Sequence, residues 1–89
     1  MSHKILVVDD EPDVRRFLTA VLAKRGYVTV AAADGREALE VARRERPDLV
    51  ILDLMMPNQT GTDFYRRLAK DEELCRTPII VVSGLAGRH

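Results

Sequence analysis

The feature that most constrains this chain is a regular alternation of short apolar runs with longer amphipathic segments. Residues 5–8, 49–52 and 79–82 read ILVV, LVIL and IIVV, and all three runs are continuously apolar. Such runs are typical of strands that are covered on both faces, as in parallel sheets. Residues 27–30 read YVTV and alternate instead, which predicts a half-exposed strand at a sheet edge.

The segments between these runs have the spacing of amphipathic helices. The first predicted helix begins at Pro12, which suits the first helical position, and ends at Gly26, a favoured left-handed cap. Its apolar residues form one face: Val14, Phe17, Leu18, Val21 and Leu22. A second helix is expected from about residue 36 to residue 46, where Pro47 ends it. Its inward residues are Ala38, Leu39, Val41 and Ala42.

A loop at residues 57–61 precedes the third predicted helix. Thr60 and Asp63 resemble a capping box at the start of this helix. The helix is expected to end between residues 71 and 74 and to direct three side chains toward the sheet: Phe64, Tyr65 and Leu68.

Strand and helix therefore alternate as βαβαβαβ over residues 1–89, the pattern of a doubly wound α/β fold with a parallel sheet. Right-handed crossovers restrict the strand order, and the order 2-1-3-4 places the first and third strands side by side. The fourth strand then becomes an apolar sheet edge, which invites pairing with another chain. We expect either that something covers this edge or that part of the domain is missing.

Composition argues against several classes of function. The 14 basic and 14 acidic residues cancel, whereas proteins that bind nucleic acid usually carry a basic patch. A single cysteine, Cys75, cannot form an internal disulfide. The apolar runs are far shorter than the roughly 20 residues of a membrane helix. We therefore expect a soluble, cytoplasmic protein that contacts neither nucleic acid nor membrane directly.

Acidic side chains follow two strands that are expected to be neighbours. Asp9 and Asp10 end the first strand and Asp53 ends the third, so the three carboxylates would share one rim of the sheet. Such a cluster either takes up protons or recruits a cation, and oxygen ligands with room for water favour Mg²⁺. A single aspartate at a strand end is usually a turn or cap residue. From the residues alone, both interpretations stay open.

Ser83 ends the fourth strand on the same rim. A hydroxyl at this place is usually part of a turn. Beside a phosphoryl group on Asp53 it could instead donate a strong, charge-assisted hydrogen bond.

The chain resembles the receiver domains of two-component response regulators. The resemblance rests on V-V-D-D-E-P after the first strand, D-L-M-M-P-N-Q-T-G around Asp53 and I-I-V-V-S-G at the fourth strand. The stretch around Asp53 is the most specific part, because its Asp, Met, Pro and Gly stand at the family's spacing. The separation of 30 residues between Asp53 and Ser83 is also similar to that of the family.

This resemblance implies a flavodoxin-like fold and a bacterial signalling role. Asp53 would accept a phosphoryl group from a sensor histidine kinase or phosphotransfer protein. Asp9 and Asp10 would hold Mg²⁺ directly or through water, and Met55 would add its backbone carbonyl. Ser83 matches the switch hydroxyl that turns toward the phosphoryl group. The remaining matched positions are structural: Met56, Pro57 and Gly61 in the loop, and Gly84 after the switch.

Receiver domains normally continue through a fifth strand that ends in a lysine, with helices on either side of it. The lysines here do not match that position, since they stand at the start of a strand and on helices: Lys4, Lys24 and Lys70. Residues 1–89 are therefore expected to form an incomplete receiver domain. A second hypothesis follows, in which a phosphorylation-impaired chain forms a homodimer or domain-swapped dimer through its open fourth strand.

Two enzyme classes fit the sequence poorly. A dinucleotide site needs glycines after the first strand, where this chain reads Asp9-Asp10-Glu11-Pro12. Phosphatases with an aspartyl nucleophile place a D-x-D pattern there, whereas the aspartates here are adjacent. We therefore expect a phosphoacceptor signalling domain and not an enzyme.

Overall fold

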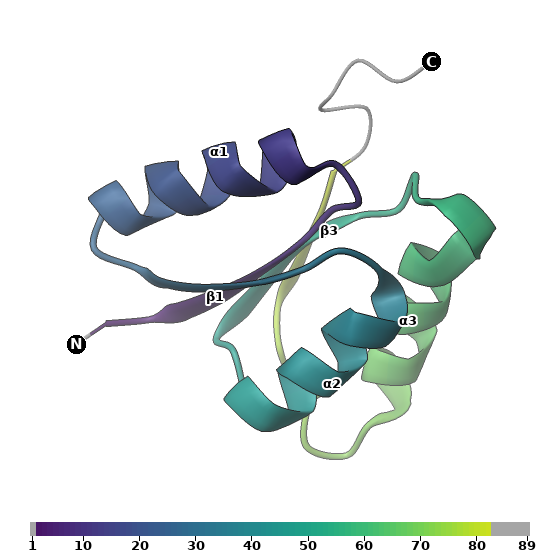
Figure 1. The fold of residues 1–89 in the computed structure, drawn as a ribbon. Coiled ribbons are helices and arrows are strands. Elements are labelled where there is room, and N and C mark those ends of the chain that lie inside the picture. Colours follow the sequence, from purple (N-terminus) through teal and green to yellow (C-terminus); the bar gives the residue numbers. More distant parts are fainter. Residues whose placement is uncertain (1, 83–89) are drawn as a thin grey trace.

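The computed structural model describes residues 2–82, which form a parallel four-stranded sheet with helices on both faces (Figure 1). The strands are β1 (Lys4–Val8), β2 (Val28–Ala32), β3 (Leu49–Asp53) and β4 (Ile79–Val82). The helices are α1 (Pro12–Lys24), α2 (Gly35–Glu45), a short 3₁₀ turn η1 (Pro57–Gln59) and α3 (Thr60–Lys70). The strand order is β2-β1-β3-β4, which confirms the predicted doubly wound fold.

The main core lies between the sheet and the two helices α2 and α3, which share one face (Figure 1). Successive residues of a strand point to opposite faces, so Leu6 of β1 and Val50 and Leu52 of β3 point toward these helices. Phe64 and Leu68 of α3 pack against them, and each of these five side chains is at most 1 % exposed. This packing fixes β1 and β3 as the two central strands.

Helix α1 lies alone on the other face and contacts mainly β1 and β2 (Figure 1). None of its residues is buried, although the sequence predicts one apolar face. Phe17 is 66 % exposed and Val21 is 40 % exposed. The apolar face therefore exists as predicted, but within residues 2–82 no second helix packs beside α1 to cover it.

Strand β4 is a sheet edge, as expected. It pairs with β3 in parallel register, with Val50 opposite Ile79 and Leu52 opposite Val81. Ile80 and Val81 point to opposite faces of the sheet and are 50 % and 45 % exposed. The described part of the chain thus presents an apolar edge without a covering element.

The segment after β3 is more regular than the predicted loop, because η1 continues directly into α3. Asn58 adopts the left-handed conformation, with φ of 60°. The backbone N–H of Thr60 donates to the carbonyl oxygen of Pro57, and Thr60 has helical backbone angles. Thr60 is therefore the first residue of α3 and not its cap, so the predicted capping box is wrong. Asp63 instead pairs with Arg67 at 3.1 Å.

The expectation that Tyr65 points toward the sheet is wrong, and the helix ends one residue before its predicted end. Tyr65 is 45 % exposed, because it lies about 100° around the helix from Phe64. The helix ends at Lys70, before the predicted residues 71–74. There Asp71 accepts hydrogen bonds from the backbone N–H groups of Glu73 and Leu74 at 2.9 and 3.0 Å, and these bonds begin a turn. None of the helices described in residues 2–82 is long and apolar enough to span a membrane.

Candidate functional site

Asp53 is the last residue of β3, and its side chain is 1 % exposed. The strand lies between β1 and β4, so the carboxylate is held at the centre of the sheet's carboxyl edge. The backbone N–H of Met55 donates to Oδ1 of Asp53 at 2.8 Å. This bond orients the carboxylate, while the side chain of Met55 is 61 % exposed.

Asp9 and Asp10 follow β1 on the same edge. The backbone N–H of Asp9 donates to the carbonyl oxygen of Ala32 at 3.2 Å, which extends the pairing with β2 by one residue. Oδ1 of Asp9 accepts a hydrogen bond from the backbone N–H of Glu11 at 2.9 Å. Asp9 is 1 % exposed and Asp10 is partly exposed. The turn thus directs one buried and one accessible carboxylate to the rim.

The three aspartates meet as the sequence predicts. Asp9, Asp10 and Asp53 each contribute one carboxylate oxygen, and these oxygens all lie within 4.8 Å of one another. A pair of like charges at this separation costs about 3 kcal/mol at an effective dielectric constant of 20. A divalent cation between them would offset this repulsion. The cluster contains only oxygen donors and is open to water at Asp10, so its residues fit Mg²⁺.

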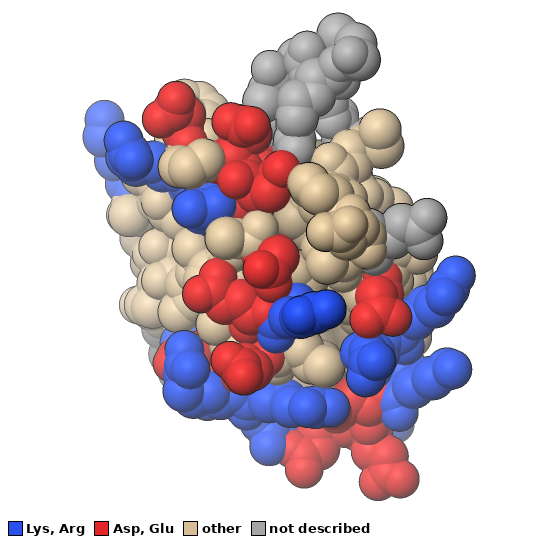
Figure 2. Space-filling view, turned by 45° about the vertical axis from the view of Figure 1, so that its right-hand side comes forward, with Lys and Arg blue, Asp and Glu red and all other residues tan. Residues whose placement is uncertain are grey.

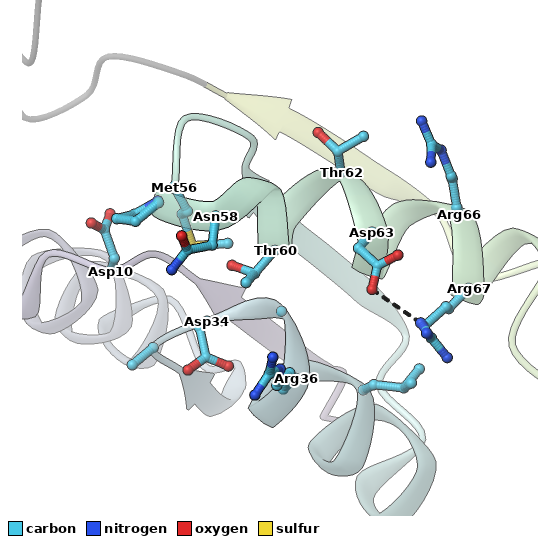
Figure 3. Close-up of a pocket in the computed structure, with 14 residues that line it drawn as sticks. Asp10, Asp34, Arg36, Met56, Asn58, Thr60, Thr62, Asp63, Arg66 and Arg67 are labelled. Atoms are coloured by element: carbon cyan, nitrogen blue, oxygen red, sulfur yellow. Dashed lines mark hydrogen bonds and ion pairs between the residues drawn. The ribbon is translucent and has the colours of Figure 1, made fainter.

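A groove of about 770 Å³ opens beside Asp10, between the start of α2 and the start of α3 (Figure 3). Two acidic groups on its walls already have partners. Asp34 accepts a hydrogen bond from the backbone N–H of Glu37 at 2.9 Å and so caps α2, and Asp63 pairs with Arg67. The accessible side of the carboxylate cluster therefore faces a space with mixed polar and apolar walls.

Other charged side chains surround the site in a mixed pattern. Figure 2 shows acidic and basic side chains interspersed over the face in view, with acidic groups in its upper and middle parts. The face in view therefore carries charges of both signs and no field of a single sign.

Two of the loop residues predicted to be structural, Met56 and Gly61, are packed against the core and the end of β3. Met56 is 6 % exposed and belongs to the main core. Gly61 lies against the end of β3, because a Cβ placed on it would stand 2.7 Å from the carbonyl oxygen of Asp53. Ser83 and Gly84 lie outside the described residues, so their predicted roles stay predictions.

One residue beside the site, Arg15, was not predicted from the sequence. Nη1 of Arg15, on α1, donates to the backbone carbonyl oxygen of Asp9 at 2.6 Å. Long helical side chains point back toward the N-terminus of their helix. An arginine in the first turns of α1 was therefore a recognisable candidate to reach the preceding turn.

The structure combines a doubly wound α/β fold with three carboxylates at the carboxyl ends of two neighbouring strands. These features define a class of α/β proteins with a candidate site for a divalent cation at this edge of the sheet. Residues 5–88 match the family model of the response regulator receiver domain. The chain belongs to this family.

Individual relatives agree with the family assignment. Sporulation initiation phosphotransferase F of Bacillus subtilis is 40 % identical over 84 residues, which are 94 % of this chain and 68 % of that protein. The probable transcriptional regulator ycf27 of Porphyridium aerugineum is 46 % identical over 85 residues, which are 96 % of this chain. The chain spans only 34 % of the ycf27 protein's length.

Solved structures show the same fold. The chemotaxis response regulator CheY4 of Vibrio cholerae superposes with a TM-score of 0.85 at 37 % identity, over 91 % of this chain and 68 % of that one. The N-terminal domain of a response regulator receiver protein from Methanoculleus marisnigri gives a TM-score of 0.85 at 34 % identity, over 89 % of this chain and 64 % of that one. This chain is thus similar to about two thirds of each of these structures.

Proposed function

We propose that this chain accepts a phosphoryl group on Asp53, with Mg²⁺ held by the carboxylates of Asp9, Asp10 and Asp53 and the backbone carbonyl of Met55. The observation that carries this proposal is the meeting of three carboxylate oxygens from two neighbouring strands within 4.8 Å. The family assignment supports a histidine kinase or phosphotransfer protein as the donor. It also supports our proposal that residues 1–89 belong to one receiver domain and act in the cytoplasm.

In the proposed reaction a carboxylate oxygen of Asp53 attacks the phosphorus of a phosphohistidine. A phosphorus–oxygen bond forms while the phosphorus–nitrogen bond breaks, and the imidazole leaves with the bonding electron pair. The backbone N–H of Met55 keeps the attacking carboxylate in place. A bound Mg²⁺ supplies neutralisation of the charge on the phosphoryl oxygens.

The product is an acyl phosphate on Asp53. In this proposal it acts as a signal that changes the conformation of the domain, and it is not released as the product of an enzyme. It adds negative charge and acceptor oxygens at the end of β3, next to β4. We propose that the hydroxyl of Ser83, which follows β4 in the sequence, responds to this change by donating a hydrogen bond to the phosphoryl group. We therefore propose a signalling domain that assists its own phosphorylation and is not an enzyme with a separate substrate.

The test is intact mass spectrometry after incubation with Mg²⁺ and acetyl phosphate, a small phosphodonor. The wild-type chain should gain one phosphoryl group, and chelation of Mg²⁺ should prevent the gain. Asp53→Asn keeps the shape and the acceptor for Met55 but should gain none. Asp63→Asn, a change of an exposed aspartate on α3, is the matched control and should behave as wild type.

The proposal fails if the folded wild-type chain neither gains phosphate nor binds Mg²⁺. Phosphorylation of Asp53→Asn to the wild-type extent would assign the reaction to another residue.

A second function is favoured by the open edge at β4. We propose that the chain pairs with a second copy along this strand, because within residues 2–82 β4 bonds only to β3 and because Ile80 and Val81 are half exposed. Apolar edge strands without charged residues pair readily with other strands. Light scattering over a concentration series should show a dimer. Ile80→Lys should abolish it, whereas Val28→Lys, on the opposite edge strand β2, should not.

A wild-type chain that stays monomeric at high concentration contradicts this second function. A dimer that survives Ile80→Lys would exclude pairing along β4 and would leave exchange of elements between the two copies as its cause.

A further inference from the structure

The turn that carries Asp9 and Asp10 is tied to its surroundings at Asp9. The backbone of Asp9 is tied to Ala32, and its Oδ1 accepts from the backbone of Glu11. Glu11 precedes α1 as its cap residue but forms no side-chain cap hydrogen bond. The start of α1 therefore lacks the contact that usually fixes the entry of a chain into a helix.

Arg15 supplies a contact of another kind at this place. Its Nη1 donates to the carbonyl oxygen of Asp9 at 2.6 Å, in partly buried surroundings. The backbone N–H of Arg15 also donates to the carbonyl oxygen of Glu11 at 3.0 Å. This backbone bond is the regular bond of the first helical turn, so the contact specific to the Arg15 side chain is the one to the Asp9 carbonyl oxygen.

We propose that Arg15 is a positioning residue for the metal site. Its bond to the Asp9 carbonyl holds the turn in the conformation that brings the Asp9 and Asp10 oxygens within 4.8 Å of Asp53. The inference rests on the proposed function, since it takes this carboxylate cluster as the Mg²⁺ site. Residues that orient metal ligands in this way typically contribute about 10- to 100-fold to metal affinity.

The direction in which the cation affinity changes on removal of Arg15 distinguishes a positioning role from a purely electrostatic one. If Arg15 acted only as a nearby positive charge, its removal would strengthen the binding of a cation, because like charges repel. If Arg15 positions the turn, its removal weakens binding. Mg²⁺ requires near-ideal octahedral geometry, whereas Ca²⁺ accepts variable geometry. Loss of positioning should therefore weaken the binding of Mg²⁺ more than the binding of Ca²⁺.

The experiment is calorimetric titration of the 89-residue chain with Mg²⁺ and, separately, with Ca²⁺. Arg15→Met should lose about tenfold in Mg²⁺ affinity and less in Ca²⁺ affinity, so the ratio of the two affinities falls. Arg16→Met removes the same charge from the next position of α1. The Arg16 side chain is 77 % exposed and lies 3.9 Å from Asp13, so this control should bind both ions as wild type does.

Several outcomes would overturn the inference. Arg15→Met that binds Mg²⁺ as tightly as wild type, or more tightly, excludes positioning. If the affinities for Mg²⁺ and Ca²⁺ fall by the same factor, their ratio stays unchanged. That result would indicate a smaller fraction of folded protein and not a loss of positioning. If Arg15→Met does not fold, Arg15→Ala replaces it, because alanine has no donor that reaches the Asp9 carbonyl oxygen. An unchanged ratio in that variant overturns the inference. Failure of the wild-type chain to bind Mg²⁺ would overturn the proposed function as well.

Discussion

Gly61 lies directly against the carbonyl oxygen of Asp53. A Cβ built on Gly61 would stand 2.7 Å from this oxygen and 3.2 Å from the Cα of Leu54. The first turn of α3 therefore packs on the very residue that ends β3 and carries the candidate phosphoacceptor. Only a residue without a side chain permits this approach, which explains the glycine of the D-L-M-M-P-N-Q-T-G stretch in physical terms.

Gly61→Ala should disturb the site as well as the fold. The added methyl group meets backbone atoms that cannot rotate away, so α3 or the end of β3 must shift. We expect a loss of about 1 to 3 kcal/mol in the free energy of unfolding and a weaker affinity for Mg²⁺. Urea denaturation and calorimetric titration measure the two effects.

Gly26→Ala is the matched control for Gly61→Ala. Gly26 has a φ of +90° and nothing within 4 Å of a built Cβ, so alanine there introduces backbone strain of about 1 kcal/mol or more far from the site. Its Mg²⁺ affinity should equal that of wild type. If both variants lose affinity equally, the contact between Gly61 and Asp53 does not shape the metal site.

Gly35→Ala should destabilise the chain more than Gly61→Ala. Gly35 is the first residue of α2, and a Cβ there would overlap the carbonyl group of Thr60 at the start of α3. The two helices would have to separate, at a cost of about 3 kcal/mol in the free energy of unfolding. Arg36→Ala, a change of the exposed neighbour, should stay within about 0.5 kcal/mol of wild type. A stable Gly35→Ala variant would contradict this close packing of α2 on α3.

Asp53→Asn should stabilise the chain when no divalent cation is present. The change removes one of three close charges and keeps an acceptor for Met55, so we expect a gain of about 1 to 3 kcal/mol at low ionic strength. Mg²⁺ at 100 times its dissociation constant should stabilise the wild type by about 2.7 kcal/mol and the variant by much less. Thermal denaturation with and without Mg²⁺ tests both, and equal stability without Mg²⁺ would argue against repulsion in the cluster.

Asp71 makes part of the free energy of unfolding dependent on pH. Hydrogen bonds from the backbone N–H groups of Glu73 and Leu74 lower the pKa of Asp71 below its ordinary value of 3.8, and nearby Arg43 lowers it further. The resulting stabilisation is complete well above pH 3.8 and is lost as the pH falls through the lowered pKa. Asp71→Asn should therefore be less stable than wild type near pH 7. Urea denaturation at a series of pH values should show this difference shrinking below pH 3.8; a constant difference would contradict the assignment.

Local pattern was sufficient for most of the secondary structure. The apolar runs at β1, β3 and β4 were strands because continuous β-branched sequence suits a sheet covered by helices. The acidic rim followed from the predicted strand order 2-1-3-4, which places Asp9, Asp10 and Asp53 at the ends of two neighbouring strands, and the structure confirms this pairing. The start of α3 was mistaken because Thr60 and Asp63 match a capping pattern, whereas the preceding 3₁₀ turn already satisfies the backbone of Thr60.

The sequence by itself determined the alternation of strands and helices and the aspartates at two strand ends, because both follow from the pattern along the chain, and the motifs around Asp53 indicated the family and with it the strand order. Only the tertiary structure showed which contacts hold those carboxylates in place. The bond from Arg15 to Asp9 and the approach of Gly61 to Asp53 join residues of different elements, and their existence depends on how the helices pack on the sheet. The exposure of Phe17 likewise depends on the elements around α1, which the apolar pattern of that helix does not specify.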